Sequence, residues 1–440
     1  MPEIFLNNNI AIILLVFSAY LVLKGKIGFA TGIYTALPSY YTIIRFGDVN
    51  HIWVYMLTMA GTFAVYKSKN QSISILPRRD RWIILWLAAW AVFVILQLLF
   101  NKGDPTLNLS LLKYFCLYLL LPLPFFMLLV TNLRQIRSFA AAFSLTMVIG
   151  CLIAFARMQK NLGTAFVSFI RNPLFRGFQD NVMHWYSTQM ELGNYHVFGY
   201  GVVIGILLLI PLFYYHRSVT VRAGLSIAGI ILIYALAISN SRQSLIFGIG
   251  VALLLIRSVF GKHNRFYKYM LYLIVLISLY LSYHIYLLRP EEFLRHGSSL
   301  SQSLNPFLER GSFWLDGIYA FLDSPAWGDW YAGSASLGHN YFISTLANQG
   351  VVGIVFIAAF MHFYAKRLRY VKKWFVNSEA TLWQLTFVAI GAFSFLCAQV
   401  SGAPVSSWPI MWAAVSLWRI QELPVKSCRQ NDKLNQTPLI

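Results

Sequence analysis

Apolar windows about as long as a bilayer is thick recur along this chain from Ile10 to Leu417, and no long soluble block interrupts them. A helix needs about 20 apolar residues to span a membrane. Because 58% of the 440 residues are hydrophobic and 11% are charged, too little polar surface remains to cover a soluble globule of this size. The sequence therefore predicts an all-α fold, a polytopic transmembrane bundle that occupies residues 1–440 as a single integral-membrane domain.

The windows predict twelve or thirteen spans. The number depends on the first two windows, which are short or weak, on the tight hairpin from Ala223 to Ile256, and on the last window, which contains Pro409. The predicted spans are Ile10–Leu23, Ile27–Ile44, Ile52–Tyr66, Trp82–Phe100, Leu112–Val130, Phe139–Phe155, Val197–Tyr215, Ala223–Ile238, Leu245–Ile256, Tyr269–Leu288, Tyr341–Tyr364, Thr381–Val400 and Trp408–Leu417.

Basic residues alternate between the loops on the two sides of these spans. Since lysine and arginine accumulate in cytoplasmic loops, we assign to the cytoplasm the loops that carry Lys67, Lys69, Arg78, Arg79, Arg81, Arg134, Arg137, Arg217, Arg222, Arg257, Lys262, Arg265, Lys268, Lys366, Arg367, Arg369, Lys372, Lys373, Arg419, Lys426, Arg429 and Lys433. The first window has no basic residue before it and Lys24 and Lys26 after it, so we expect an uncleaved helix with its N-terminus outside. The formal net charge of +20 then faces the headgroups of membrane lipids, and no nucleic-acid partner is expected.

This assignment leaves two long segments on the outer face, Ala156–His196 and Arg289–Asn340. Both are too irregular and too rich in Gly, Ser, Asn and Pro to be spans. Within them, Phe166–Ile170 and Gly311–Leu322 have the pattern of amphipathic helices that lie on a membrane surface. We expect these two loops to handle the substrate.

The outer face holds more basic residues than such a face should. They are Arg157, Lys160, Arg171, Arg176, Arg242, Arg289, Arg295 and Arg310. Arg289 and Arg295 lie close to glutamates, and ion pairing explains them. For the remaining arginines, pairing with outer acids is the alternative to an anionic ligand, which the planar guanidinium fork suits because it binds two oxygens of a phosphate or diphosphate.

Arg242 is the clearest of these cases. It lies in the polar hexapeptide Ser239–Ser244 between two apolar helices. A charge within a span costs about 2.5 to 3.5 kcal/mol on insertion scales, and such residues usually face the bundle interior and serve a function. The alternative is that Arg242 reaches along its helix to the interface.

His339 directly precedes Asn340 and the helix predicted to begin at Tyr341. Histidine titrates near neutrality, so here it suits a general base toward a sugar hydroxyl or a hydrogen-bond donor to a phosphate. The alternative is a helix cap or an interface residue. No His, Cys or carboxylate stands three or four residues after His339, so no metal is expected.

Several other features predict structure and not chemistry. Asp323–Gly328 has the composition of a turn, and Gly350 and Gly353 are small positions suited to helix packing. Inert packing is expected for the cysteines, which are Cys116, Cys151, Cys397 and Cys428. Nucleotide-phosphate and dinucleotide loops are absent from the sequence, so we expect neither a nucleotide donor held by such a loop nor a cofactor.

The order of these motifs resembles the O-antigen ligase and O-antigen polymerase superfamily. Ser241-Arg242 lies between two helices, Arg310 in a long outer loop, Asp-x-Pro-x-x-Gly at Asp323–Gly328, and Gly-His-Asn-Tyr-Phe followed by Gly-Val-Val-Gly within Gly338–Gly353. The resemblance covers roughly Ile231–Ala365. It implies a GT-C-like, metal-independent membrane glycosyltransferase that acts on undecaprenyl-diphosphate-linked glycans at the periplasmic face of the bacterial inner membrane.

In that family two arginines and a histidine of the outer loops surround the diphosphate. Arg242, Arg310 and His339 match those positions by motif context. The resemblance implies that the arginines bind the diphosphate and stabilise charge as the glycan leaves, while His339 orients or deprotonates the acceptor hydroxyl, or helps to hold the diphosphate. Further candidates for substrate binding are Arg157, Arg171, Arg176 and Asn340.

The motif from Gly338 to Gly350 favours a polymerase, which transfers the glycan onto a lipid-linked repeat unit and can have a chain-length regulator as a partner. The alternative within the family is a ligase, which transfers the glycan to lipid A core. The alternative from another class is a lipid-linked oligosaccharide flippase. Transporters commonly have duplicated halves, and the sequence shows no such duplication.

Overall fold

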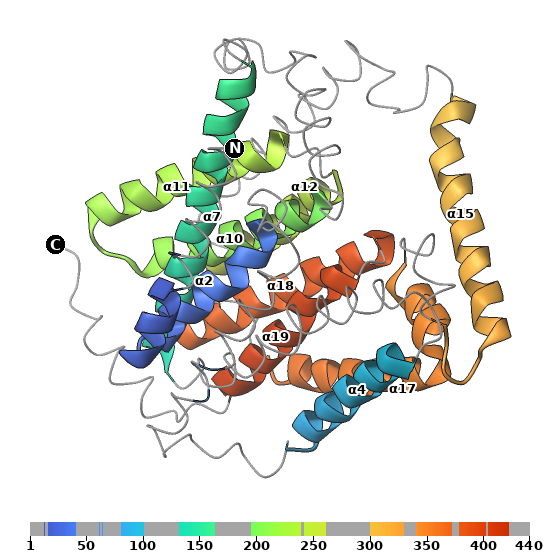
Figure 1. Cartoon of the computed structure of the whole chain (residues 1–440). Coiled ribbons are helices and arrows are strands. Elements are labelled where there is room, and N and C mark those ends of the chain that lie inside the picture. Colours follow the sequence, from blue (N-terminus) through green and yellow to red (C-terminus); the bar gives the residue numbers. More distant parts are fainter. Residues whose placement is uncertain are drawn as a thin grey trace.

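A computed structural model describes residues 13, 16–40, 61, 64, 81–100, 132–162, 195–238, 242–260, 300–329, 340–371, 378–401 and 404–421. These residues form helices and short connections, and none of them forms a strand (Figure 1). The helices are α2 (Ile27–Tyr40), α4 (Arg81–Phe100), α7 (Leu133–Leu162), α10 (Tyr195–Tyr215), α11 (Val219–Ile238), α12 (Arg242–Phe260), α15 (Leu300–Asp323), α17 (Tyr341–Arg369), α18 (Glu379–Ser401) and α19 (Pro404–Gln421).

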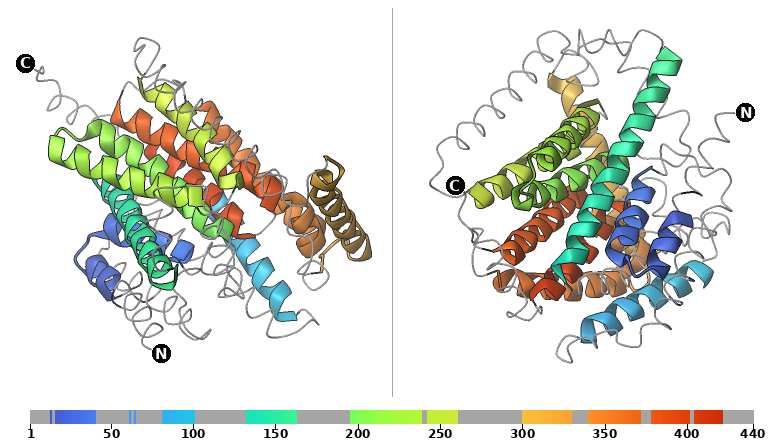
Figure 2. Two further views of the ribbon diagram at one scale, coloured as in Figure 1. Left: turned by 90° about the horizontal axis from the view of Figure 1, so that it is seen from above. Right: turned by 90° about the vertical axis from the view of Figure 1, so that its left-hand side faces the viewer.

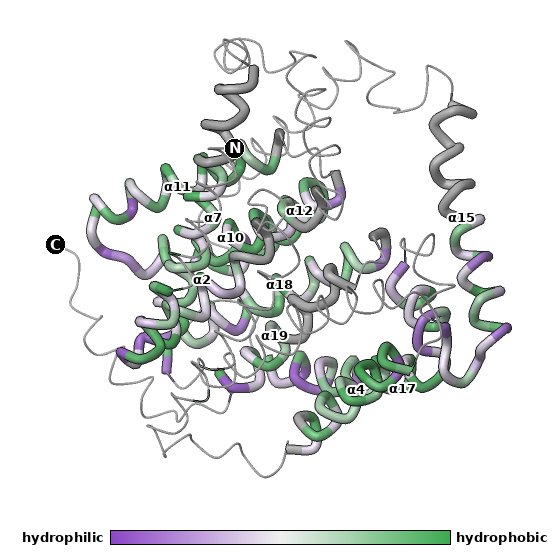
Figure 3. Tube along the Cα trace, in the orientation of Figure 1, coloured by the Kyte–Doolittle hydropathy of each residue, from purple (hydrophilic) through white to green (hydrophobic). Residues whose placement is uncertain are grey.

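Five of these helices contain segments long and apolar enough to cross a membrane. The segments are Leu133–Leu152, Phe198–Tyr215, Val219–Leu236, Tyr341–Arg369 and Glu379–Gln399. Apolar residues also dominate α4, which lies beside α17 and is mostly green in Figure 3. The described part of the chain therefore has the helices that a multi-pass membrane protein needs.

Most predicted spans coincide with helices, and the differences lie at their ends. The predicted spans Ile52–Tyr66, Leu112–Val130 and Tyr269–Leu288 lie wholly or almost wholly outside the described residues. The helix predicted to end at Phe155 continues to Leu162 as α7. The apolar window ends at Phe155 because mostly polar residues follow. The helix continues because these residues, which include arginine, methionine, glutamine and lysine, favour a helical backbone.

The second outer segment also contains more helix than its composition predicts. The amphipathic helix expected over Gly311–Leu322 is present, and it begins earlier, so that α15 covers Leu300–Asp323. The segment predicted as a long loop before Asn340 is therefore helical over much of its length.

Small residues bring the first helices together. Side-chain carbons added at Gly28 and Gly32 of α2 would overlap the backbone carbonyls of Gln135 and Phe139 in α7. Because both contacts advance by four residues along each chain, α2 and α7 run in the same direction. Close backbone approach through glycine is a common way to pack helices in membranes.

Contacts between other neighbours show how the spans alternate. The rings of Trp82 and Phe363 lie 6.0 Å apart, and Gln97 Nε2 donates to Asn348 O at 2.7 Å, so α4 and α17 are antiparallel. In the same way, α17 and α18 are antiparallel because Tyr364 reaches Val388 O and Asn340 reaches Gln399 O. These directions agree with the alternation predicted from the charges.

Basic residues gather at one end of this arrangement, which we call the basic end. It is defined by Arg137, Arg367 and Arg369. There Gln421 Nε2 donates to Arg367 O at 3.0 Å, which joins the ends of α19 and α17. Arg137 near the start of α7 forms an ion pair with Glu379 at the start of α18.

Helix α15 differs in orientation from the helices of membrane-spanning length next to it. In Figure 1 it stands upright at the edge of the molecule, whereas α18, α19 and the later part of α17 run across the picture. Figure 2 shows the same helix at one end of the bundle when the molecule is seen from above. This end is the one remote from Arg367, because α17 begins beside α15 and ends at the basic end.

Candidate functional site

Asn340 caps the start of α17. Its backbone is extended, and its Oδ1 accepts hydrogen bonds from the backbone amides of Phe342 at 3.0 Å and Ile343 at 3.2 Å. These amides are among those that a helix leaves without partners at its N-terminus. Asn340 Nδ2 also donates to Gln399 O at 3.4 Å in α18. The capping role considered for His339 is therefore filled by Asn340, and His339 precedes the cap.

The cap lies at what we call the Asn340 end of the bundle, defined by Tyr200, Gln243, Asn340 and Gln399, which belong to four different helices or their starts. Gln243 Nε2 in α12 donates to the Tyr200 hydroxyl of α10 at 2.6 Å. The ring of Tyr200 lies 5.9 Å from that of Phe393 in α18. Through α18 these contacts reach Gln399 and hence Asn340. The starts of α10, α12 and α17 thus lie at the same end of the bundle.

Helix α17 is broken ten residues after its cap. Gly350 has φ 63° and ψ −158°, a combination open essentially to glycine alone. A side-chain carbon there would overlap the backbone carbonyls of Pro325 and Ala326. The prediction that Gly350 serves ordinary helix packing was incomplete, because the residue both packs closely and interrupts the helix.

The segment that docks at the break is the turn after α15. The turn predicted at Asp323–Gly328 is confirmed: Gly328 N donates to Ser324 O at 2.8 Å, and the Ser324 hydroxyl donates to Gly328 O at 3.1 Å. Gly328 has φ 70°, and a side-chain carbon there would overlap the backbone of Asn348 and Gln349. The two glycines therefore let the turn and the broken helix touch backbone to backbone.

The turn satisfies the backbone groups that the break leaves without helical partners. Val351 N donates to Pro325 O at 2.9 Å, and Ala347 O accepts from Asp329 N at 2.7 Å. Unpaired peptide groups are costly in an apolar surrounding. The break is therefore stable because a specific neighbour completes its hydrogen bonds.

Helix α4 holds the turn and the break from the other side. Gln97 Nε2 donates to both Trp327 O and Asn348 O, and Trp90 Nε1 donates to the Gln349 side chain at 2.8 Å. The ring of Phe93 stacks on Trp327 at 5.7 Å. We call Trp90, Phe93 and Gln97 the α4 clamp. Sequence reasoning missed it, although Gln97 is the one polar residue within the window Trp82–Phe100.

Two of the predicted catalytic residues lie in described helices: Arg242 begins α12, and Arg310 lies in α15. The side chains of both arginines are outside the described part of the chain, and so is the whole of His339. Arg242 is next to Gln243, and His339 is next to Asn340. The structure thus brings the immediate neighbours of two candidates, Arg242 and His339, to the same end.

The predicted substrate-binding residues are placed less completely. Arg157 lies in α7, toward the end remote from Arg137, and its side chain is not among those described. Arg171 and Arg176 lie outside the described residues. For Asn340 the structure shows the cap, and substrate binding stays a prediction. Within the described ranges, no three or more His, Cys, Asp and Glu residues form a group that could hold a metal ion.

A comparison of the sequence with protein-family models found no match, and a comparison with curated proteins found none.

Proposed function

We propose that the protein is a glycosyltransferase of the O-antigen polymerase type. It transfers an undecaprenyl-diphosphate-linked glycan onto a lipid-linked repeat unit at the periplasmic face of the bacterial inner membrane. The observation that carries this proposal is that Gln243 and Asn340 lie at the same end of the bundle, each in contact with a chain of residues that leads to α18. These residues directly follow Arg242 and His339, which are far apart in the sequence.

The first part of α17, which begins at the Asn340 end, is also joined to α15, the helix that carries Arg310. Helix α15 continues into the turn that docks on α17, and Ala320 packs against Ala347. Two arginines and a histidine on three different helices or their starts suit a large anionic ligand, because a diphosphate offers oxygens in several directions. Electrostatic stabilisation of a leaving diphosphate is most effective when such groups are preorganised.

In the proposed reaction, an acceptor hydroxyl oxygen bonds to the anomeric carbon of the glycan, and the bond from that carbon to the diphosphate breaks. Arg242 and Arg310 bind the diphosphate and stabilise the charge that develops on it. His339 takes the hydroxyl proton or orients the hydroxyl. Asn340 supports this role indirectly, because its two bonds to α17 and its bond to α18 fix the chain next to His339.

The break in α17 is the observation that favours a second candidate, a lipid-linked oligosaccharide flippase. Transporters commonly bind substrates at broken helices, where unwound backbone groups contact the cargo. Here, however, four backbone groups at the break, from Ala347, Asn348, Val351 and Val352, have hydrogen bonds to the turn or to Gln97. Glycan transfer therefore remains the better proposal.

The test is glycan transfer by the purified full-length protein in lipid nanodiscs, with undecaprenyl-diphosphate-linked repeat units as substrate. Arg242→Ala, Arg310→Ala and His339→Ala should each abolish the polymeric product while the amount of protein in the membrane stays the same. The matched control is Arg369→Ala, which removes an exposed arginine at the basic end and should leave transfer unchanged. Normal product from all three variants would overturn the proposal.

The acceptor is tested in a deletion strain through its lipopolysaccharide. Core that bears a single repeat identifies a polymerase, since ligation continues without chain growth. Naked core together with accumulated lipid-linked polymer identifies a ligase, the alternative that uses the same diphosphate site. Movement of lipid-linked repeats across vesicles without any transfer would identify the flippase.

A further inference from the structure

We propose that α15 lies in the membrane interface at the Asn340 end and docks on the bilayer through one apolar face. This face, which we call the α15 stripe, consists of Trp314, Leu315, Ile318, Tyr319 and Leu322. The partner is membrane lipid. Docking of α15 on lipid holds the outer segment at the membrane and does not depend on glycan transfer.

The side chains of α15 divide its surface into three sectors. At about 100° per residue, Gly317 and Ala320 fall on one side, and both are buried. Ala320 belongs to a buried pair with Ala347, so this side faces α17. The exposed polar residues Asp316 and Asp323 fall in a narrow sector of their own. The α15 stripe fills the sector between these two.

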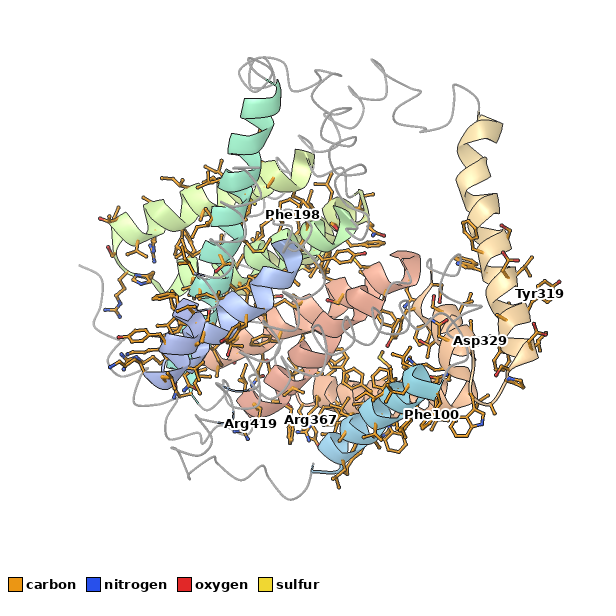
Figure 4. All side chains as sticks on the ribbon, in the orientation of Figure 1. Phe100, Phe198, Tyr319, Asp329, Arg367 and Arg419 are labelled. Carbon is orange, nitrogen blue, oxygen red and sulfur yellow. The ribbon has the colours of Figure 1, made fainter. Side chains whose placement is uncertain are left out.

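The stripe is well exposed for residues of its kind. Tyr319 is 62% exposed and Leu322 is 61% exposed, although large apolar side chains are normally drawn into a core. Figure 4 labels Tyr319 on the side of α15 that points away from the bundle. Contiguous exposed apolar residues on one helix face mark a surface that binds an apolar partner.

The direction of α15 fits an interface better than a span. The helix stands transverse to α18, α19 and the part of α17 after Gly350, at one end of the bundle (Figures 1 and 2). If α17 and α18 cross the bilayer, a helix transverse to them at their outer ends lies along the membrane surface. Interfacial helices have this orientation, with one apolar face buried in the boundary between headgroups and acyl chains.

The stripe continues onto the apolar surface of α4. Trp327, 62% exposed, follows α15 and stacks on Phe93 of α4. The last residues of α4, Leu99 and Phe100, are also largely exposed. Since α4 is apolar over its whole length after Arg81 apart from one glutamine, its exposed side chains suit acyl chains. The continuity between α4 and α15 indicates that one bilayer contacts both.

Residue types in the stripe favour lipid over sugar. Exposed aromatic rings alone would also suit stacking on a glycan. Here, however, the aliphatic residues Leu315, Ile318 and Leu322 share the face with Trp314 and Tyr319. Tryptophan and tyrosine are enriched at membrane interfaces, where their rings have apolar bodies and polar tips. Aliphatic neighbours have no hydrogen bond to offer a sugar, and they gain from contact with acyl chains.

Spin labels on the full-length protein in nanodiscs test this inference. After replacement of Cys116, Cys151, Cys397 and Cys428 by alanine, single labels are attached through Ile318→Cys and Leu322→Cys on the stripe. The matched controls are Asp316→Cys and Asp323→Cys on the polar sector of the same helix. The measurement is relaxation by oxygen, which concentrates in lipid, compared with relaxation by a water-soluble nickel complex.

We expect labels at 318 and 322 to be relaxed more by oxygen and less by nickel than labels at 316 and 323. A label at Val355→Cys, an exposed position in the apolar half of α17, provides the lipid reference. Nickel access equal at all four positions of α15 would place the helix outside the bilayer. Low access to both reagents at 318 and 322 would show a cover of protein, either another segment or a second copy. Protection by soluble oligosaccharide would show a glycan platform, and each of these three results overturns the proposal.

Discussion

The two parts of α17 on either side of Gly350 are stabilised in different ways. Before the break, the buried side chains are mostly polar; they include Ser344, Thr345, Asn348 and Gln349. After the break, they are mostly apolar or aromatic; they include Ile357, Phe360, Phe363 and Tyr364. The first part depends on particular hydrogen bonds, and the second depends on packed volume.

The second part ends in aromatic contacts that surround a buried charge. The ring of Phe363 meets Trp82 at 6.0 Å and Trp418 at 5.7 Å, both edge to face. Arg367, 4% exposed, places its guanidinium over the rings of Phe363, Tyr370 and Trp418. Many partners share the contact here, so the loss of one atom leaves most of the packing in place.

The two parts of α17 should therefore differ in their tolerance of substitutions. Hydrogen bonds at the break are few and directional, so the loss of one donor leaves a carbonyl unpaired. The free energy of apolar packing changes gradually with the volume of the side chain. We therefore expect substitutions at the break to be severe even when they are small, and conservative substitutions beyond it to be mild.

The largest effect is expected for Gly350→Ala. The fold requires a backbone conformation at this position that costs about 1–3 kcal/mol in a residue other than glycine. The added carbon also overlaps backbone atoms of Ala326, which adds about 1–3 kcal/mol of overpacking. Thermal unfolding in detergent should show a strongly lowered midpoint and a reduced yield of folded protein.

Gly250→Ala is the matched control for this change. Gly250 lies in α12, and no atom comes within 4 Å of a side-chain carbon built there. Alanine should be neutral there or stabilise the helix by about 0.5–1 kcal/mol. Equal midpoints for the two variants would contradict a specific demand for glycine at the break.

An intermediate effect is expected for Gln97→Leu. The substitution removes the donor to Trp327 O and Asn348 O while it keeps the apolar character of α4. The bond to Asn348 O is partly buried and the bond to Trp327 O is exposed, so the loss should lie at the low end of the about 1–3 kcal/mol that a buried unpaired carbonyl costs. The unfolding midpoint should fall, and a protease should cut the turn faster. The exposed neighbour Leu96→Val serves as the control, and similar protease sensitivity in both variants would argue against the α4 clamp.

The smallest effect is expected for Ile357→Leu in the second part of α17. Ile357 is buried, but leucine keeps its apolar volume, and such exchanges usually cost less than about 1.5 kcal/mol. The unfolding midpoint should shift less than for Gln97→Leu, and the protease sensitivity of the turn should stay normal. A larger shift than that of Gly350→Ala would reverse the contrast between the two parts.

Sequence reasoning predicts the helices well and their junctions poorly. The period of the apolar residues predicts the part of α15 from Gly311 to Leu322, and proline with glycine predicts the turn at Asp323–Gly328. The cap at Asn340 also had a signal, since asparagine just before an apolar helix is a preferred cap. That signal predicts the cap, whereas substrate binding by Asn340 stays a prediction.

The break and the α4 clamp could not be derived in the same way. Gly350 and Gly353 look alike in sequence, and only the docked turn shows that the first interrupts α17 while the second remains helical. Gln97 stood out as a polar residue in an apolar window, but its partners lie 230 and 251 residues away in the chain. The residue types of the candidate arginines suggest their chemistry, whereas Gln243 and Asn340 come to the same end of the bundle through contacts between segments that are distant in the chain.

The positions of these contacts along the chain have a consequence for the order of assembly. The turn and the break come from neighbouring segments, since Pro325 bonds to Val351. They close a short loop, which costs less chain entropy than a long one. Trp90, by contrast, reaches Gln349 across 259 residues. The pair of α15 and α17 can therefore form as a local unit late in synthesis. Helix α4 is synthesised much earlier, and its contacts with α17 can form only after that pair has been made.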